Sequence, residues 1–164
     1  MRNLENENKY YLWDYIRAAS FFSLYGCVKY LPNFVGDYFR YLVLKIFMRE
    51  IHSKRIKDGA TFWFPHGISI GRNVSINEYV FINGFGGVRI GNFVRIAHRA
   101  SIMSENHGID NIEKEIFLQK KIPGEIIIED GVWIGMGAMI TMGVKMPQLQ
   151  NLWVTFGSGN FPSV

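Results

Sequence analysis

Isoleucine recurs at every sixth residue through the middle of this chain, with two interruptions. The positions are Ile70, Ile76, Ile82, Ile90, Ile96, Ile102, Ile128, Ile134 and Ile140. An α-helix repeats every 3.6 residues and a β-strand every two, so neither produces a period of six. A six-residue period is typical of a parallel β-helix, in which each unit supplies one short strand and one turn of a three-sided coil.

The residues around each isoleucine fit this geometry. Four positions after most of them stands a small or β-branched residue, such as Val74, Ala100 or Ala138. We expect each isoleucine to point into the prism and stack on the isoleucine of the next coil. The residue four positions later must then be small, because it occupies a crowded corner.

Two interruptions break the six-residue spacing. Two extra residues fall between Ile82 and Ile90, and an insert at 108–127 separates two blocks that are otherwise in phase. Long inserts in compact domains usually carry function, so we expect a protruding loop here. The pattern predicts three full coils and, through Phe64 and Ile68, a partial coil before them. The full coils are 70–87, 90–107 and 128–145.

The first third of the chain is rich in aromatic side chains with basic residues among them. Apolar residues at helical spacing predict two helices, about 9–30 and 35–50, separated at Leu31-Pro32-Asn33. One interpretation is a helical cap on the open end of the β-helix. The other is a peripheral membrane contact, with the cations toward lipid phosphates. Both interpretations can be correct if they apply to different faces of the helices. The basic residues are Arg17, Lys29, Arg40, Lys45 and Arg49.

The composition excludes some classes of protein. A length of 164 residues suits one domain. The net charge of +4 is compatible with an anionic cofactor, nucleic acid or a phospholipid surface, but no nucleic-acid-binding motif is present. One cysteine, Cys27, excludes an internal disulfide framework and a zinc site built on paired cysteines. With no signal peptide and no spanning segment in the sequence, we expect a cytoplasmic protein.

The pattern divides the chain into three parts: an aromatic-rich helical cap at 1–57, the β-helix at 58–145 and an irregular tail at 146–164. After Lys145 the six-residue pattern is lost, because Met146-Pro147 begins a stretch without it. One explanation is a truncation or frameshift. The other is an unusual cap, in which Trp153, Phe156 and Phe161 cover the last coil.

Several motifs add a resemblance to a known family. The sequence resembles the hexapeptide-repeat acyltransferases, in the branch that O-acetylates sugars. This branch includes galactoside and maltose acetyltransferases and enzymes of capsule and lipopolysaccharide gene clusters. The resemblance covers 64–145 and rests on Ile82-Asn83, on 90–97, on Asn106-His107 and on 124–135.

The resemblance implies a fold, a reaction and site residues. It implies a left-handed parallel β-helix of hexapeptide repeats that forms a homotrimer, with active sites between subunits and acetyl-coenzyme A (acetyl-CoA) as donor. By the same resemblance, His107 is the general base, Asn83 contacts the acceptor saccharide, and Trp133 and Met136 belong to the wall of the acetyl-CoA site. The implied setting is bacterial surface polysaccharide biosynthesis, in the cytoplasm or peripheral at the inner face of the cytoplasmic membrane.

The chemistry of His107 agrees with this role. Acyl transfer to an alcohol needs a group that accepts the hydroxyl proton, and histidine, with an ordinary pKa of about 6.5, can accept it at neutral pH and return it. Glu105 or Asp110 is near enough in sequence to orient the imidazole. The alternative is a solvated turn histidine.

The other candidate residues also keep simpler alternatives. Asn83 stands where asparagine is a common turn former. Trp133 could only cover a coil face. Lys120 and Lys121 on the insert could meet coenzyme A phosphates or be solvated.

Other functions remain as alternatives at this stage. One is a C-terminally truncated, inactive β-helix scaffold without a complete acetyl-CoA site. A zinc enzyme of the β-helical carbonic anhydrase kind needs three histidines on adjacent coil faces. His98 and His107 are nine residues apart and no third histidine follows, so no metal is expected.

Overall fold

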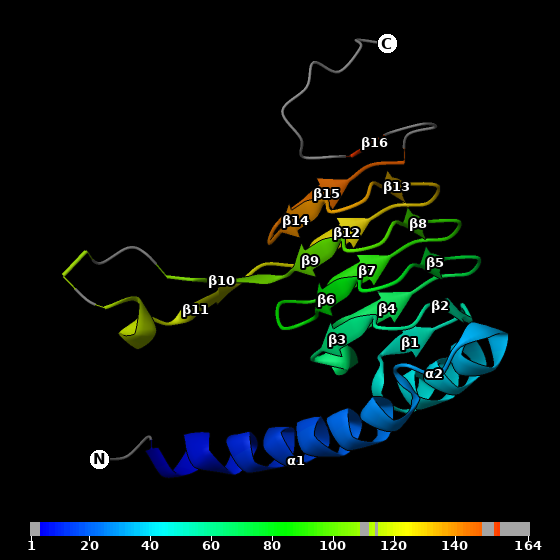
Figure 1. The fold of residues 1–164 in the computed structure, drawn as a ribbon. Helices are drawn as coiled ribbons and strands as arrows, with labels where there is room; N and C mark the ends of the chain where they lie inside the picture. The colour runs from blue at the N-terminus through cyan, green and yellow to red at the C-terminus, as the bar shows by residue number, and fades with distance from the viewer. Residues whose placement is uncertain (1–3, 109–111, 114, 149–152, 155–164) are drawn as a thin grey trace.

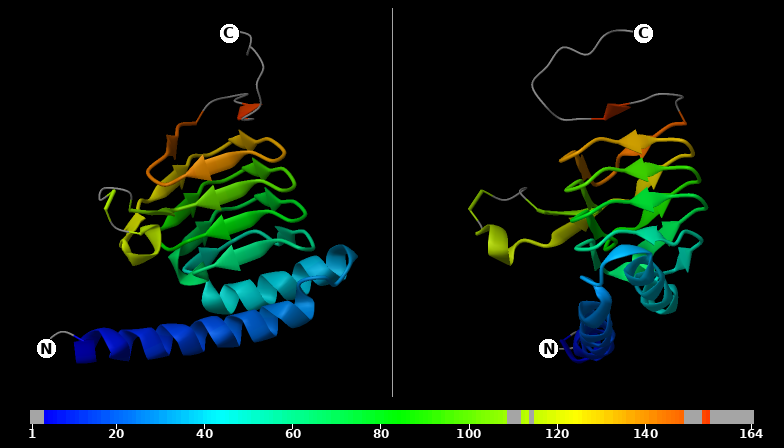
Figure 2. Two further views of the ribbon diagram at one scale, coloured as in Figure 1. Left: turned by 60° about the vertical axis from the view of Figure 1, so that its left-hand side comes forward. Right: turned by 45° about the vertical axis from the view of Figure 1, so that its right-hand side comes forward.

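A computed structural model describes residues 4–108, 112–113, 115–148 and 153–154. Two helices, α1 (Leu4–Val28) and α2 (Asn33–Phe47), lie across one end of a stack of short strands. The helices end slightly earlier than the predicted 30 and 50. Figures 1 and 2 show the strands wound into successive coils that rise away from the helices.

The coils build three parallel sheets. The first sheet contains β1 (Glu50–Ile51), β4 (Ile68–Ile70), β7 (Val88–Ile90), β12 (Ile126–Ile128) and β15 (Lys145–Met146). The second sheet contains β2 (Arg55–Ile56), β5 (Ser75–Ile76), β8 (Arg95–Ile96), β13 (Trp133–Ile134) and β16 (Trp153–Val154). The third sheet contains β3 (Thr61–Trp63), β6 (Phe81–Asn83), β9 (Ser101–Met103) and β14 (Met139–Thr141).

The isoleucine ladder fills the axis of the prism, as predicted. All nine isoleucines of the repeat are buried, with at most 3% of each exposed. Within each sheet they lie in register, as in the series Ile76, Ile96 and Ile134. The pairing confirms a parallel β-helix, whose stability comes from apolar contacts between neighbouring coils.

The corners of the prism use a conformation that the pattern did not reveal. Three residues after the inward isoleucine of the first-sheet strands β4, β7 and β12, the backbone is left-handed, at Asn73, Phe93 and Gly131. The N–H of Phe93 donates to the oxygen of Arg72, one coil below, at 2.9 Å. The N–H of Gly131 donates to the oxygen of Asn92 at the same distance. These bonds between coils offset the strain that a left-handed conformation imposes on a side-chain-bearing residue.

The β-helix begins earlier and continues further than the sequence predicted. The strands β1 and β2 lie within the segment 1–57 that was assigned to the helical cap, so the first coil starts at Glu50. Phe62, not Phe64, is the inward residue below Ile82. Beyond 145, Met146 is buried above Ile128 and β16 pairs with β13, so regular structure extends into the segment predicted to be irregular. Phe156 and Phe161 lie outside the described residues.

The two helices cover the first coil, as the cap interpretation predicted. Phe21 and Tyr25 of α1 are buried, and the Tyr25 ring meets the Phe62 ring edge-on at 5.8 Å. The Tyr25 hydroxyl donates to the carbonyl oxygen of Ala60 at 3.1 Å. Burial raises the pKa of Tyr25, so this hydroxyl stays a neutral donor. The cap therefore closes the lower end of the apolar axis.

Arg40 joins both helices to the β-helix. Its side chain is fully buried, so Arg40 does not fit the membrane-contact interpretation, which directs the basic residues at lipid phosphates. Its guanidinium donates to the oxygen of Val28, the last residue of α1, to that of Leu31 in the linker, and to that of Ile56 in β2. It also pairs with Asp37 at 2.8 Å. One buried cation thus satisfies carbonyl groups at the end of α1 and fixes α2 on the first coil.

Asp130 links two stacked corners and should make stability depend on pH. The backbone N–H of Asn92 donates to Asp130 Oδ1 at 2.6 Å, and this bond holds the pKa of the carboxyl below its ordinary value of 3.8. Because the folded state lowers this pKa, the carboxylate stabilises the fold above pH 3.8, and the contribution is lost as the pH falls further. We expect Asp130→Asn to be less stable than wild type in urea at neutral pH, with a gap that narrows in acid. A gap independent of pH would contradict this, and Glu129→Gln is the control.

Candidate active site

An arm leaves the β-helix between the third and first sheets. It begins with β10 (Glu105–His107), which pairs antiparallel with β11 (Lys121–Pro123), and it carries a 3-10 turn at Ile116–Leu118. Figure 1 shows it projecting from the stack, and both views of Figure 2 agree. The sequence predicted this loop at 108–127. The structure places its strands from 105 and returns the chain to the first sheet at Ile126.

The root of the arm is built from a buried serine and two glycines. The Ser104 hydroxyl donates to the oxygen of Asn83 at 2.7 Å and accepts the N–H of Gly86 at 2.9 Å. A Cβ added to Gly86 would lie 2.2 Å from the oxygen of Ser104 and 2.6 Å from the nitrogen of Gly124. Only glycine fits at Gly86, because any side chain there would collide with the backbone of Ser104 and Gly124. The corner that contains the two extra residues between Ile82 and Ile90 therefore packs directly against the start and the end of the arm.

Glu105 connects three chain segments at this root. Its Oε1 accepts a hydrogen bond from the Asn83 side-chain amide at 2.8 Å and forms an ion pair with Lys121 Nζ at 2.9 Å. The carboxylate is nearly buried, and its Oε2 has no hydrogen-bond partner among the described residues. Lys121 Nζ also lies 5.7 Å from the centre of the Phe85 ring. These contacts fix β10, the first strand of the arm, on Asn83 of β6.

His107 is exposed on β10, directly opposite Lys121 in the antiparallel pair. Residues two apart in a strand share a face, so His107 lies on the same face of β10 as Glu105. Its backbone N–H donates to Asn106 Oδ1 at 2.9 Å. The imidazole is therefore exposed to solvent at the base of the arm, beside the hydrogen-bonded group formed by Glu105, Asn83 and Lys121.

Asn83 lies in the same corner but is buried. Only 2% of the residue is exposed, and its amide nitrogen is bonded to Glu105. Its amide oxygen accepts the N–H of Phe85 at 2.9 Å. These contacts support the turn interpretation of Asn83, because both ends of the amide are used within the chain.

Trp133 and Met136 lie on a different side of the prism. Trp133 belongs to β13 in the second sheet, and Met136 lies in the corner that follows it; both are exposed. In a single chain they are not brought together with His107. A site that used all three would need the second sheet of one copy beside the arm of another.

Other residues singled out in the sequence take varied positions. His98 and Lys120 are exposed, and Asp110 lies outside the described residues. The sequence predicts that Glu105 or Asp110 orients His107, whereas the side chain of Glu105 binds Asn83 and Lys121 in the structure. The role of Lys121 in binding Glu105 was missed. The antiparallel pairing of 105–107 with 121–123 would have indicated it, but the sequence alone gives no register for the insert.

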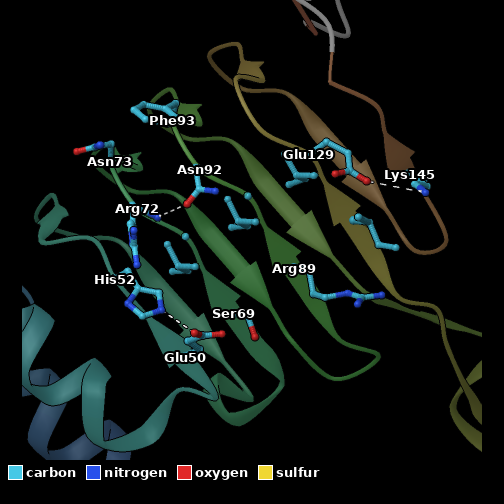
Figure 3. Close-up of a pocket in the computed structure, with 16 residues that line it drawn as sticks. Glu50, His52, Ser69, Arg72, Asn73, Arg89, Asn92, Phe93, Glu129 and Lys145 are labelled. Carbon is cyan, nitrogen blue, oxygen red and sulfur yellow. Dashed lines mark hydrogen bonds and ion pairs between the residues drawn. The ribbon is translucent and has the colours of Figure 1, made fainter.

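A broad hollow of about 950 Å³ lies elsewhere, over the outer face of the first sheet. Figure 3 shows its charged side chains, which include Arg72, Arg89 and Lys145 from three different coils. Lys145 faces Glu129 at 3.8 Å, and Arg89 pairs with Glu125 beside the arm at 2.7 Å. None of the four predicted site residues lines this hollow.

The described residues contain neither a metal-binding cluster nor a membrane-spanning helix. Within 4–108, 112–113, 115–148 and 153–154, no three His, Cys, Asp or Glu side chains are grouped in a way that could hold a metal ion. Neither helix in the described part of the chain combines the length and apolar character needed to cross a bilayer.

The fold is similar to that of solved acetyltransferases. A hexapeptide-repeat-containing acetyltransferase from Vibrio cholerae, in complex with acetyl-coenzyme A, matches with a TM-score of 0.68 and 21% identity over 79% of this chain and 69% of that one. A galactoside acetyltransferase in complex with coenzyme A matches with a TM-score of 0.66 and 22% identity, over 80% and 65%. A maltose O-acetyltransferase from Clostridium difficile matches with a TM-score of 0.66 and 19% identity, over 81% and 70%.

These likenesses confirm the predicted fold class, a left-handed parallel β-helix with N-terminal helices. At this level of identity they establish the fold. No protein-family model and no curated protein matches the sequence.

Proposed function

We propose that this protein is an O-acetyltransferase that moves an acetyl group from acetyl-CoA to a hydroxyl of a saccharide. One observation carries the proposal. In its described part the β-helix is interrupted by a single arm, and His107 is exposed at the base of that arm, which the Asn83–Glu105 hydrogen bond holds in place. The similar folds of acetyltransferases solved with coenzyme A or acetyl-CoA give independent support.

The chemistry requires one group that moves a proton, and we assign that role to His107. A neutral imidazole takes the hydroxyl proton while the acceptor oxygen bonds to the acetyl carbonyl carbon. The carbon–sulfur bond breaks, and the imidazolium returns the proton to the coenzyme A thiolate. Every proton is accounted for, and no covalent enzyme intermediate is needed. Glu105 and Lys121 act as positioning residues, because they fix the strand that carries His107.

The donor would be held partly by a neighbouring copy. Trp133 and Met136 offer exposed apolar surface that fits a pantetheine chain, but they lie on the second sheet, away from His107. A homotrimer in which the second sheet of one copy faces the arm of the next would join them, and we propose this arrangement. We also propose that the reaction belongs to bacterial surface polysaccharide synthesis in the cytoplasm.

Acetyl-CoA turnover tests the function directly. Thiol release should depend on an added saccharide acceptor, and it should be measured over a panel of free and nucleotide-linked sugars. The alternative, an inactive scaffold without a complete donor site, is separated by calorimetry with coenzyme A. Saturable binding with saccharide-dependent release supports the enzyme, whereas absence of binding supports the scaffold.

Glu105→Gln tests the positioning role. The amide keeps the size of the side chain and loses the charge that pairs with Lys121, so the arm root should loosen. We expect kcat to fall about tenfold while KM for the saccharide stays nearly constant, since misplacement of a catalytic group acts on the reaction step. Lys121→Arg should keep most of the activity and Lys121→Met should not. Equal losses in both lysine variants, or an effect on KM alone, would contradict the assignment.

A further inference from the structure

The outward side of α2 is apolar and uncovered. Leu44 and Arg40 face the β-helix and are fully buried, whereas the residues on the opposite side of the helix are exposed. Phe34 is 79% exposed and Ile46 is 72% exposed. The exposed apolar residues on this side of the helix form the outer face of α2: Phe34, Val35, Tyr38, Phe39, Leu42 and Ile46.

These residues follow one stripe rather than a scatter. Val35, Tyr38, Phe39, Leu42 and Ile46 have the three- and four-residue spacing of one helical side. Single exposed apolar residues are normal, but a continuous aromatic and aliphatic stripe on a helix marks an interaction surface. Figure 1 shows α2 at the end of the stack, away from the arm.

Cations border this outer face. Lys54, from the turn between β1 and β2, lies 5.8 Å from the centre of the Tyr38 ring and 5.7 Å from that of Tyr41. Lys45, near the end of α2, lies 5.9 Å from the Tyr41 ring.

Carboxylates are nearly absent from the same region. Between Ile16 and Asp58, a stretch whose side chains are all described, the acidic residues are Asp37, Glu50 and the half-buried Asp58. Asp37 faces inward, paired with Arg40 and Lys57 at 2.8 and 2.6 Å. Glu50 lies 2.6 Å from His52. The cap surface around α2 is therefore apolar at its centre and positive at its border.

We propose that the outer face of α2 docks on an anionic lipid bilayer, with α2 lying in the plane of the membrane interface. Apolar and aromatic side chains enter the boundary between headgroups and acyl chains, and Lys45 and Lys54 meet the lipid phosphates. A second copy of this chain would instead bring its own lysines against these, which is unfavourable. The surface thus matches a lipid phosphate layer in both polarity and charge.

Vesicle flotation of the full chain tests this docking. Wild type should float with vesicles of equal parts phosphatidylglycerol and phosphatidylcholine, and not with phosphatidylcholine alone. We expect Ile46→Glu to lower the bound fraction about tenfold, because it places a carboxylate within the apolar stripe. Ile112→Glu is the matched control, since Ile112 is 99% exposed on the arm, and it should float like wild type. Both positions are exposed, so circular dichroism should report unchanged folding.

The outcomes separate the possible occupants of this face. Loss of flotation in high salt and in Lys54→Glu, with Lys120→Glu unaffected, supports docking through the cations beside α2. No flotation of wild type, or equal flotation of Ile46→Glu, would overturn the proposal. A smaller assembly of Ile46→Glu in light scattering would overturn it as well, because the face would then be covered by another copy. The result does not depend on acetyl transfer, so it stands or falls separately from the proposed function.

Discussion

His107→Ala is expected to lower kcat for saccharide-dependent thiol release by about 10²–10⁴-fold, the usual contribution of a general base. The imidazole lies exposed on β10 at the root of the arm, and no other histidine lies on that strand. Because alanine removes the proton acceptor and leaves the Glu105 bridge in place, binding of coenzyme A should stay close to wild type. Steady-state kinetics and calorimetry on the same preparation measure both quantities.

His98→Ala is the matched control for this substitution. His98 is also an exposed histidine, and it lies in the corner between β8 and β9. Its replacement should leave kcat within about twofold of wild type, as expected for a surface position away from the reaction. Equal rates for wild type and His107→Ala would remove His107 from the mechanism, and a loss in both variants would indicate an indirect effect on the fold.

Arg40→Met is expected to give the largest loss of stability, about 3–5 kcal/mol. Methionine fills part of the space but leaves the buried Asp37 carboxylate with Lys57 as its remaining recorded partner. It also removes the hydrogen bonds that the oxygens of Val28, Leu31 and Ile56 accept from the guanidinium, and among the described residues only that of Val28 keeps another donor, the N–H of Leu31. The cap should separate from the first coil at lower urea concentrations than the other coils unfold.

Lys45→Met provides the comparison on the same helix. Lys45 is exposed, so its loss should change the free energy of unfolding by less than about 0.5 kcal/mol. Urea unfolding followed by circular dichroism gives the stability, and limited proteolysis between α2 and β1 reports release of the cap. A loss for Arg40→Met no larger than that for Lys45→Met would show that the buried network is not what holds the cap.

The isoleucine period was enough to predict the axis of the fold. It reports one inward side chain per strand, and such a signal is local and repeats in every coil. All nine positions are buried, and the N-terminal helices and the arm follow from aromatic spacing and from the break in phase. The six-residue period did not predict the strands of coils whose length or inward residues differ from the repeat. Ile51 and Ile56 point inward from the first two strands but are only five residues apart, so the six-residue spacing did not reveal them. Phe62 and Met146 take inward positions without being isoleucine.

The candidate site was less predictable, because its contacts join residues far apart in sequence. His107 and Asn83 were named from short motifs, but the burial of Asn83 depends on Glu105, which lies 22 positions later. The partnership of Glu105 with Lys121 depends on the register of β10 and β11, which no periodicity encodes. Arg40 illustrates the same limit, since a cation in an aromatic helix predicts a surface and the structure buries it among main-chain oxygens.

Transfer of an isotope-labelled acetyl group tests the central claim most directly. The protein is incubated with acetyl-CoA labelled in its acetyl carbon and with a saccharide acceptor, and the purified sugar is analysed by mass spectrometry and NMR. We expect the label in an ester on one hydroxyl of the sugar, with an equal amount of free coenzyme A and almost none from His107→Ala. Recovery of all the label as acetyl-CoA or free acetate, with every acceptor unchanged, would contradict the account.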